Sequence, residues 1–463
     1  MSCSFVPPYL LRQLAEAADD PALCEDCRET LSLDQRLRER RSAAPAELAP
    51  RVLAVQPAGA LRVVHTANNT ETLPGDPVRT DGDPPTGDLA VDEAFDSSGQ
   101  VLAMFADEFG RRSVDGRGTT LSITVHFGKD YDNAFWDGER LVFGDGDGVI
   151  FDRFTKPMDV MAHEFTHGVT QFGAGLTYSG QPGALNESVS DVFASIAKQH
   201  AGNQSVDRAS WLIGEDLFRP GVRAKALRSM IEPGTAYDDP RIGRDPQVGS
   251  MDDFVVTEED NGGVHINSGI PNRAFALAAL AVGGYSWERV GRIWYETLTG
   301  GDVTSETDFA GFARATVSAA GRLYPGDVTV AQKVRDAWGQ VKVLPEAAPP
   351  PAVATVPHPE LTAEEPELSP LEAGRISVRR TGGFAGGVRS AELDLSSDPQ
   401  GEEIRRLLRQ VNLTQIVSSR PRPDRFVYTV EYGQVRLTVP EQDLTPELNQ
   451  VVRLVLGEGR GLR

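Results

Sequence analysis

Two histidines and a glutamate in the middle of the chain have the spacing of a metal site. His163 and His167 are four residues apart, with Glu164 between them, in the stretch Asp159-Val-Met-Ala-His-Glu-Phe-Thr-His. On an α-helix, residues i and i+4 lie on one face, so both imidazoles can bind one metal ion. Glu164 is placed to reach a water on that ion. The pattern also arises by chance in helices, and a catalytic zinc needs a third protein ligand and an open position.

A third ligand for the same metal can come from the stretch Asn186-Glu187-Ser-Val-Ser-Asp191. The separation between His167 and Glu187 leaves room for one helix to end, a loop to turn and a second helix to begin. Asp191 lies one turn after Glu187 on the same face, where its carboxylate can accept the free ring N–H of a histidine ligand. The plain alternative is an amphipathic helix that binds no metal.

The elements that position these residues follow from hydrophobic periodicity and turn residues. Residues 52 to 151 contain short β-like runs, such as 121–126, separated by Gly, Asp, Asn and Pro turns, so we expect strands there. Between residues 156 and 200 the periodicity is helical. Further helices are expected at 271–281, 287–297, 307–323 and 330–338.

These motifs resemble those of the thermolysin family of zinc endopeptidases. After His-Glu-Phe-Thr-His come Gly-Ala-Leu-Asn-Glu-Ser-Val-Ser-Asp and then Asp260-Asn-Gly-Gly-Val-His-Ile-Asn-Ser-Gly-Ile. Upstream, Asp132-Asn-Ala-Phe-Trp and Gly144-Asp-Gly-Asp-Gly match as well. The resemblance extends over roughly residues 60 to 340, with the motifs in the family's order. It implies an α+β fold of two lobes, a mixed β N-terminal lobe and a mainly α C-terminal lobe, with zinc in the cleft between them.

The resemblance implies a role for each matching residue. His163, His167 and Glu187 would bind one catalytic Zn²⁺, and Asp191 would support a ligand histidine. Glu164 would activate the zinc-bound water as general base and then pass the proton toward the leaving amine.

The resemblance also implies the groups that bind the substrate. His265, positioned by Asp260, and Tyr178 would stabilise the oxyanion, and Arg228 would hold a substrate carbonyl. Two residues would align the peptide as an added strand, Asn133 and Ala134. Four apolar residues match the pocket for the residue after the scissile bond: Phe151, Phe154, Val160 and Leu227. We therefore expect cleavage before bulky hydrophobic residues.

The sequence departs from the family at its calcium sites. Asp159 and Glu215 match two ligands of a double calcium site, but Lys198 stands where a glutamate would bridge the ions. Four further calcium-site positions hold non-acidic residues: Ser210, Leu212, Arg219 and Lys225. A Lys ammonium can replace the charge of a cation but cannot coordinate one. We therefore expect zinc with weak or no calcium dependence.

The chain starts with Met-Ser-Cys-Ser-Phe-Val-Pro-Pro-Tyr-Leu-Leu, which lacks the basic start and unbroken apolar run of a signal peptide. Two short helices are expected between residues 8 and 41. The segment resembles the brief propeptide of the protealysin-like branch of the family, which implies a zymogen made without a signal peptide. Its first residues would block the cleft until cleavage between residues 42 and 60, and Pro7-Pro8 suits that role because its backbone is preset as extended. The alternative is a plain surface helix.

The three cysteines, Cys3, Cys24 and Cys27, all lie near the start of the chain. Cys24-Glu-Asp-Cys27 has the spacing of half a zinc site, but no second Cys/His pair lies near it, so two ordinary thiols are the simpler interpretation. Cys3 would approach the zinc cleft if the propeptide resemblance holds, and its thiolate as a metal ligand is a hypothesis.

The end of the chain resembles a small inhibitor. Residues 375 to about 456 have the pattern strand, strand, helix, strand, strand, helix. Within them, Arg380-Thr-Gly-Gly-Phe-Ala-Gly-Gly-Val-Arg, Phe426-Val-Tyr-Thr-Val and Leu444-Thr-Pro-Glu-Leu resemble emfourin, a protein inhibitor of protealysin-like enzymes. From residue 375 there are 14 Arg, no Lys and 11 Asp or Glu, a net charge of +3, while the rest of the chain has −24 of the total of −21. This complementarity favours an inhibitor acting in cis; a targeting or substrate-binding domain is the alternative.

Five segments are expected: propeptide 1–50, N-terminal lobe with the HExxH helix 51–200, helical C-terminal lobe 201–343, a Pro-, Ala- and Glu-rich linker 344–374, and an emfourin-like domain 375–457. The leading hypothesis is a zinc-dependent neutral endopeptidase for polypeptides; the alternative is a silenced peptidase that acts as a binding module. The net charge of −21 argues against nucleic acid, and no apolar run has the length of about 18 residues that spans a bilayer. We expect synthesis in the cytoplasm, with a non-classical route if the protein is secreted.

Overall fold

The computed structural model of the chain describes residues 3–17, 20–42, 61–345, 375–382, 389–409, 411, 426–432, 435–441 and 444–456. They belong to two compact units, Met1–Ala352 and Val353–Arg463. The expected activation segment after residue 42, most of the expected linker and the side chain of Cys3 lie outside the described residues. Within the described part, none of the helices has the length and apolar character to cross a bilayer.

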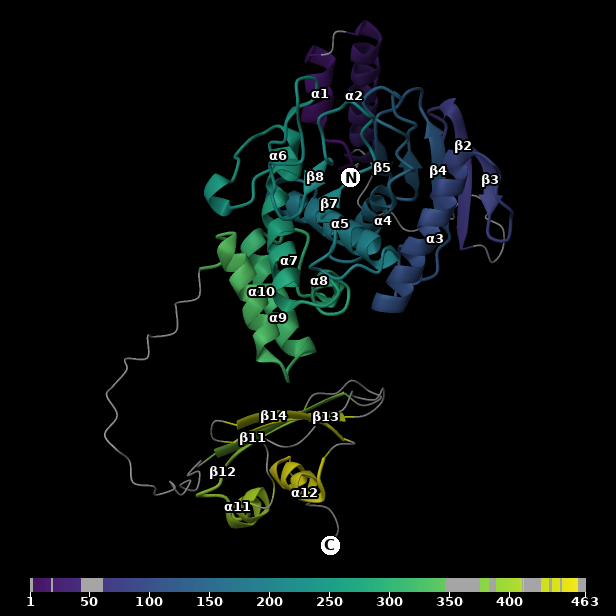
Figure 1. The fold of residues 1–463 in the computed structure, drawn as a ribbon. Coiled ribbons are helices and arrows are strands. Elements are labelled where there is room, and N and C mark those ends of the chain that lie inside the picture. Colours follow the sequence, from purple (N-terminus) through teal and green to yellow (C-terminus); the bar gives the residue numbers. More distant parts are fainter. Residues whose placement is uncertain are drawn as a thin grey trace. The chain divides into compact units, whose positions relative to one another are not determined.

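A six-stranded mixed sheet forms the N-terminal lobe of the larger unit (Figure 1). Its strands, in spatial order, are β1 (Cys3–Ser4), β5 (Ala134–Trp136), β6 (Leu141–Phe143), β4 (Leu121–Phe127), β2 (Arg62–Thr70) and β3 (Asp76–Thr80). β4 pairs in parallel with β2 and β6, and the other neighbours are antiparallel. The edge strand β1 comes from the start of the chain, so a segment expected to be a propeptide completes the sheet.

The expectation of short strands throughout residues 52 to 151 is wrong at one place. α3 (Leu89–Phe109) is a long helix inside that range. Asp88 caps its start by accepting from the backbone N–H groups of Ala90 and Val91, and Gly110 ends it at a φ of 69°. The sequence contains the signals of this helix: an Asp at its N-cap, apolar residues with helical spacing along it, and a Gly at its end.

Two buried helices pack together behind the sheet, α4 (Met158–Phe172) and α5 (Gly180–Ala201). They confirm the helical expectation for residues 156–200, with a break at the loop between them. All residues of α4 from Asp159 to Thr170 are buried, although several are charged or polar. Buried charges are stable only when they are paired or bind a metal, so the polar content of these helices indicates a site.

The C-terminal lobe is mainly helical, as expected. Its helices are η1 (Met251–Asp253), α6 (Asp260–Asn267), α7 (Gly269–Val282), α8 (Val290–Thr299), α9 (Phe309–Leu323) and α10 (Val328–Gln340). Short strands join it to α5: β7 (Leu212–Ile213), β8 (Arg228–Ser229), β9 (Asp238–Asp239) and β10 (Gly243–Arg244). Stacked indoles of Trp294 and Trp338, 6.0 Å between centroids, fasten α10 to α8.

The first two helices, α1 (Pro8–Ala17) and α2 (Pro21–Ser42), lie side by side at one end of the larger unit (Figure 1). The pair contacts both lobes: Arg12 of α1 makes an ion pair with Glu259, and Arg36 of α2 makes one with Glu71. Three leucines of α1 are completely buried: Leu10, Leu11 and Leu14. The helix pair is therefore an integral part of the packed unit rather than a surface appendage.

The second unit is a four-stranded antiparallel sheet with two helices. Its strands, in spatial order, are β12 (Arg389–Asp394), β11 (Arg375–Gly382), β13 (Phe426–Tyr432) and β14 (Val435–Pro440). Its helices are α11 (Gly401–Arg409) and α12 (Pro446–Val455), and they share an apolar core with the sheet. This order of elements is the one expected from the sequence.

Candidate active site

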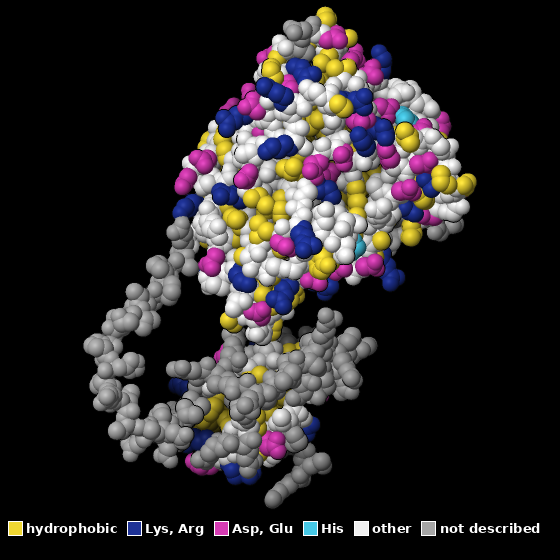
Figure 2. Space-filling model, in the orientation of Figure 1, with side chains coloured by type: hydrophobic (Ala, Val, Ile, Leu, Met, Phe, Trp, Pro, Cys, Tyr) yellow, Lys and Arg dark blue, Asp and Glu magenta, His cyan; other side chains and the backbone are white. Residues whose placement is uncertain are grey.

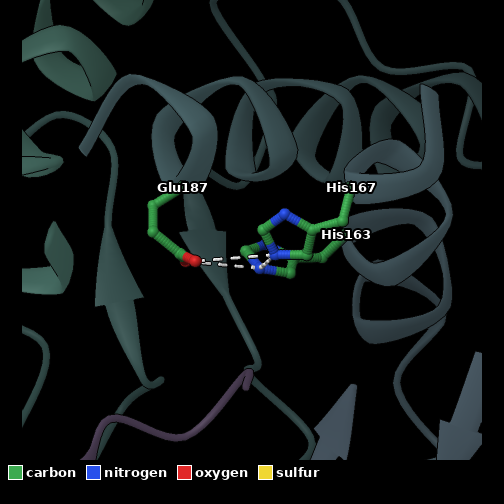
Figure 3. Close-up of side chains that lie close together, drawn as sticks. All are labelled: His163, His167 and Glu187. Carbon is green, nitrogen blue, oxygen red and sulfur yellow. Dashed lines mark hydrogen bonds and ion pairs between the residues drawn. The ribbon is translucent and has the colours of Figure 1, made fainter. Parts of the chain in front are cut away.

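The three expected metal ligands meet in the structure. His163 and His167 project from α4 and Glu187 from α5, and the three side chains point toward one another (Figure 3). The two Nε2 atoms are 3.0 Å apart, and each lies 3.4 to 3.5 Å from a carboxylate oxygen of Glu187. Ligands on a tetrahedral ion at about 2.0–2.1 Å would be about 3.3 Å apart. Among the described residues, this is the one cluster with such geometry.

The second nitrogen of each histidine is held by a neighbour on α5. His163 Nδ1 lies 2.9 Å from Asp191 Oδ1, as expected, and His167 Nδ1 lies 2.9 Å from Asn186 Oδ1. These contacts leave both Nε2 atoms directed at the shared centre, which is the arrangement a metal-binding histidine needs. Asn186 was quoted in the sequence motif without a role, so its part in the site is a finding of the structure.

Asp191 is the hub of a buried network. Arg228 donates to both of its oxygens at 2.8 Å, and Asn272 Nδ2 donates to Oδ2 at 2.8 Å. Burial alone would raise the pKa of Asp191, but the Arg228 charge and the His163 hydrogen bond lower it to about 2. Asp191 is therefore a permanent carboxylate. Asn272 was not predicted, because nothing in its local sequence marks it.

Glu164 lies on the same helix and is completely buried. Burial is the main reason that its pKa is raised, to about 8. Its two carboxylate oxygens accept no hydrogen bond within the described part of the chain. Buried oxygens without partners are costly, so these groups fit a centre that binds a cation and water.

His265 faces the ligands from α6. Asp260 accepts from its backbone N–H at 2.9 Å and lies 2.6 Å from its Nδ1, which directs Nε2 into the cleft. The turn that makes this possible has left-handed backbone at Gly262 and Gly263, with φ of 84° and 73°. The hydroxyl of Tyr178 lies 3.4 Å from His265 Nε2 and donates to Glu187. The expected oxyanion donors are thus together beside the ligands.

The cleft contains the start of the chain. β1 pairs with β5, so that Ser4 lies opposite Phe135. Phe5 N donates to Ala134 O at 3.0 Å, Arg228 Nη1 donates to Phe5 O at 3.0 Å, and His265 Nε2 lies 3.0 Å from Ser4 O.

Asn133 continues this pairing, because its side chain makes two hydrogen bonds with the backbone of Val6. Val6 N donates to its Oδ1 at 2.8 Å, and its Nδ2 donates to Val6 O at 3.2 Å. Asp34 of α2 also accepts from Asn133 Nδ2, at 3.0 Å. Asp34 was not predicted, since only the fold brings α2 beside β5.

The four predicted pocket residues are buried in one apolar cluster: Phe151, Phe154, Val160 and Leu227. The ring of Phe5 lies in the same cluster and meets His163 edge-on, with 5.0 Å between centroids. A side chain added at Gly214 would contact both Leu227 and Phe5. The aromatic ring of the N-terminal segment therefore lies beside Leu227, in the apolar cluster that contains the predicted pocket residues.

The calcium-site positions are occupied by an ion-pair cluster. Lys198 Nζ lies 2.9 Å from Glu215 and 3.3 Å from the buried Asp159, and it donates to Leu212 O. Arg219, another basic residue at these positions, makes an ion pair with Asp152 at 3.1 Å.

The two thiols of α2 are buried, and neither forms a disulfide within the described residues. Cys27 Sγ lies 4.0 Å from Asp132 Oδ2, and burial raises the pKa of the Cys27 thiol well above its ordinary value. Neither thiol belongs to the metal-ligand cluster found among the described residues. The contacts fit ordinary buried thiols better than a metal or redox pair.

Family comparisons agree with this site. Residues 60–171 match the thermolysin metallopeptidase catalytic domain, and residues 174–343 match its alpha-helical domain. An extracellular metalloprotease of Pectobacterium carotovorum is 49% identical over 343 residues, which cover 74% of this chain and 96% of the relative. The chain belongs to the thermolysin family. It is a zinc-dependent metalloprotease of that family, and the two-lobed fold expected from the sequence is confirmed.

Other members of the family are similar to large parts of this chain. The precursor of protealysin from Serratia proteamaculans is 48% identical with a TM-score of 0.67, covering 74% of this chain and all of that structure. Thermolysin of Alicyclobacillus acidocaldarius is 36% identical over 289 residues, which cover 60% of this chain and 50% of the relative. Residues 378–456 match the emfourin family, which confirms the emfourin domain expected from the sequence.

Proposed function

We propose that this thermolysin-family member is a zymogen whose protease cleaves polypeptides before bulky hydrophobic residues. The observation that supports it is the convergence of three ligand atoms, a buried glutamate and two hydrogen-bond donors on one cleft.

The donor set fits Zn²⁺. Two neutral imidazole nitrogens and one carboxylate are a usual catalytic zinc set, and the spacing of the ligand atoms suits tetrahedral bonds. His163, His167 and Glu187 would hold the ion. When bound, it would supply a Lewis acid for the scissile carbonyl and for an attacking water.

The protein groups would move the protons and hold the substrate. Glu164 would accept a proton from the attacking water and deliver it to the leaving nitrogen. His265 and Tyr178 would donate to the carbonyl oxygen as negative charge develops on it. Arg228 and Asn133 would fix the peptide backbone, which keeps the bond aligned.

The pocket residues support the proposed specificity. Phe151, Phe154, Val160 and Leu227 are apolar and buried, so a charged residue after the scissile bond would lose its solvation. The test is a peptide series that varies this position; kcat/KM for Phe or Leu should exceed that for Asp by at least about 100-fold.

Residues 1–50 are proposed as the propeptide. Residues 3–6 fill the cleft, and α1 and α2 contact both lobes, so a polypeptide substrate has no access to Asn133 or Arg228. Cleavage between residues 42 and 60 would free the segment. The domain boundaries proposed from the sequence, 51–200, 201–343, 344–374 and 375–457, complete the organisation.

The emfourin domain is proposed to inhibit the protease in cis. Its net charge of +3 is opposite in sign to the −24 of the rest of the chain, and the tether raises its effective concentration. Deleting residues 345–463 from propeptide-free enzyme should raise activity or lower KM. Unchanged kinetics would instead assign the domain to targeting or substrate binding.

Two further proposals concern ions and location. The family resemblance implies a calcium-bridging glutamate at position 198, and the Lys198 found there pairs with Asp159 and Glu215, so the enzyme is proposed to need zinc and little or no calcium. Action outside the cell is proposed because the relative from Pectobacterium carotovorum is named an extracellular metalloprotease. Figure 2 shows acidic and basic side chains interspersed on the face drawn.

The rival function is a silenced peptidase that serves as a binding module. Casein hydrolysis after limited proteolysis distinguishes the two, measured for the wild type beside Glu164→Gln. We expect hydrolysis by the wild type and a loss of at least about 1000-fold in the variant. Equal, background rates in both proteins would support the silenced module.

A further inference from the structure

The start of the chain lies in the cleft in the direction and register of a substrate, and we propose that the protease hydrolyses its own Ser4–Phe5 peptide bond. This inference rests on the proposed function. It assigns a substrate bond inside the propeptide that is distinct from the activation segment after residue 42.

Backbone contacts on both sides of this bond meet the groups proposed for a substrate. Ser4 O lies 3.0 Å from His265 Nε2, where the carbonyl of the residue before the scissile bond would lie. Phe5 N donates to Ala134 O, and Phe5 O accepts from Arg228. The peptide bond between these contacts therefore occupies the reacting position.

The residues on either side of the Ser4–Phe5 bond also pair as a bound substrate would. β1 extends the sheet before the bond, with Cys3 opposite Trp136, and Val6 exchanges two hydrogen bonds with Asn133 after it. An inhibitor that merely covered the cleft would not need pairing on both sides. A peptide bound as an added strand has both.

The Phe5 side chain meets the proposed specificity. It is completely buried, lies edge-on to His163 and has the Arg228 guanidinium 4.7 Å from its centroid. A bulky hydrophobic residue thus follows the bond, as the pocket requires. The segment is also part of the same chain, so its effective concentration at the cleft is high.

The reaction is an ordinary hydrolysis with water as co-reactant. The water oxygen bonds to the Ser4 carbonyl carbon, and Glu164 accepts the proton that the water loses. The Ser4 C–Phe5 N bond then breaks, its electron pair goes to nitrogen, and the proton passes to that nitrogen. The products are a Ser4 carboxylate and a Phe5 amine.

Cleavage at this bond would not activate the enzyme. Phe5, Val6 and the leucines of α1 are completely buried, so residues 5–42 stay docked after the cut. The new amine can still donate to Ala134 O. Among its described residues, Cys3 and Ser4, the released piece is held by the short β1 pairing and the His265 contact, and it should dissociate.

The first experiment reads the N-terminus of the full chain. The protein is prepared metal-free, Zn²⁺ is added, and N-terminal sequencing and intact mass follow the chain with time. We expect a chain that begins at Phe5, with a first-order rate unchanged over tenfold dilution, and no such product from Glu164→Gln. Phe5→Leu should be cut and Phe5→Asp should not.

The second experiment needs no metal. Because Pro7 and Pro8 lack N–H groups, deuterium exchange in a peptic peptide ending at Tyr9 reports mainly on residues 3–6. We expect at least tenfold slower exchange in the metal-free wild type than in Phe5→Ala, with Phe172→Ala, an exposed Phe, unchanged. Equal exchange in Phe5→Ala and wild type would overturn the substrate-like binding.

The outcomes separate this inference from the proposed function. A zinc-loaded chain that keeps the residues before Phe5, in a preparation that hydrolyses casein after limited proteolysis, overturns self-cleavage alone. A preparation that cuts neither casein nor the Ser4–Phe5 bond overturns both.

Discussion

Replacing Lys198 tests whether its ammonium group stabilises the fold in the way that a bound calcium ion would. Its Nζ lies between Asp159, Glu215 and the carbonyl of Leu212, and Asp159 is almost completely buried. Lys198→Met would leave the Asp159 carboxylate buried without its counter-charge. We expect the variant to have a lower Tm than the wild type.

The magnitude follows from burial. Removing one partner of a fully buried ion pair costs about 3–5 kcal/mol. The side chains of Lys198 and Glu215 are 23% and 39% exposed, and solvent screens such pairs. We therefore expect a loss of about 2–3 kcal/mol, which corresponds to about 5 °C in Tm for a domain of this size.

The assay is scanning calorimetry in a Glu164→Gln background, which prevents autolysis, with zinc content measured in each sample. Lys129→Met is the matched control, because Lys129 is 79% exposed and pairs weakly; its Tm should change by less than about 1 °C. Lys198→Glu should be destabilised without calcium and restored by millimolar Ca²⁺. The wild type should melt at the same temperature with and without EGTA.

Two results would refute this reasoning. One is a wild type that loses stability on calcium removal while it retains zinc. The other is a Lys198→Met variant with the Tm of the control.

Three further predictions concern the site and the propeptide. Asp191→Asn should weaken zinc binding by about 10- to 100-fold, measured by competition with a chelating dye, because it removes the carboxylate that orients His163. Gly263→Ala should lower kcat with less effect on Tm, measured with a peptide substrate, because the left-handed φ of 73° disfavours Ala by about 1–2 kcal/mol and displaces His265. Burial, with the Asp147 and Asp26 charges, raises the pKa of Asp132 in the docked state, so docking holds its proton more tightly. Inhibition by added propeptide should therefore weaken as the pH rises above the ordinary pKa of an Asp carboxyl, and this dependence should be lost in Asp132→Asn.

Local sequence was enough to predict the metal centre. Two histidines one turn apart on a helix can bind the same metal ion, which makes a metal site the main explanation for them. Glu187 and Asp191 have the same one-turn spacing on the next helix. The α3 helix was missed because its neighbours are rich in turn residues, and the turn signals outweighed its Asp88 and Gly110 caps. Asn272 and Asp34 could not be predicted, because each meets the site only through contacts between distant segments.

Residue types and helical spacing in the sequence predicted the metal ligands and placed Glu164 beside them, and the resemblance to the thermolysin family implied the oxyanion donors. The expectation that Pro7-Pro8 is extended is wrong at Pro8, which is the first residue of α1, where a missing N–H and a preset φ suit the start of a helix. Only the tertiary structure decided that Ser4 O faces His265 and that Lys198 stands between two carboxylates. The physical reason is register: an extended segment can pair with β5 in many alignments, and the buried Phe5 ring with the Asn133 and Arg228 hydrogen bonds selects one.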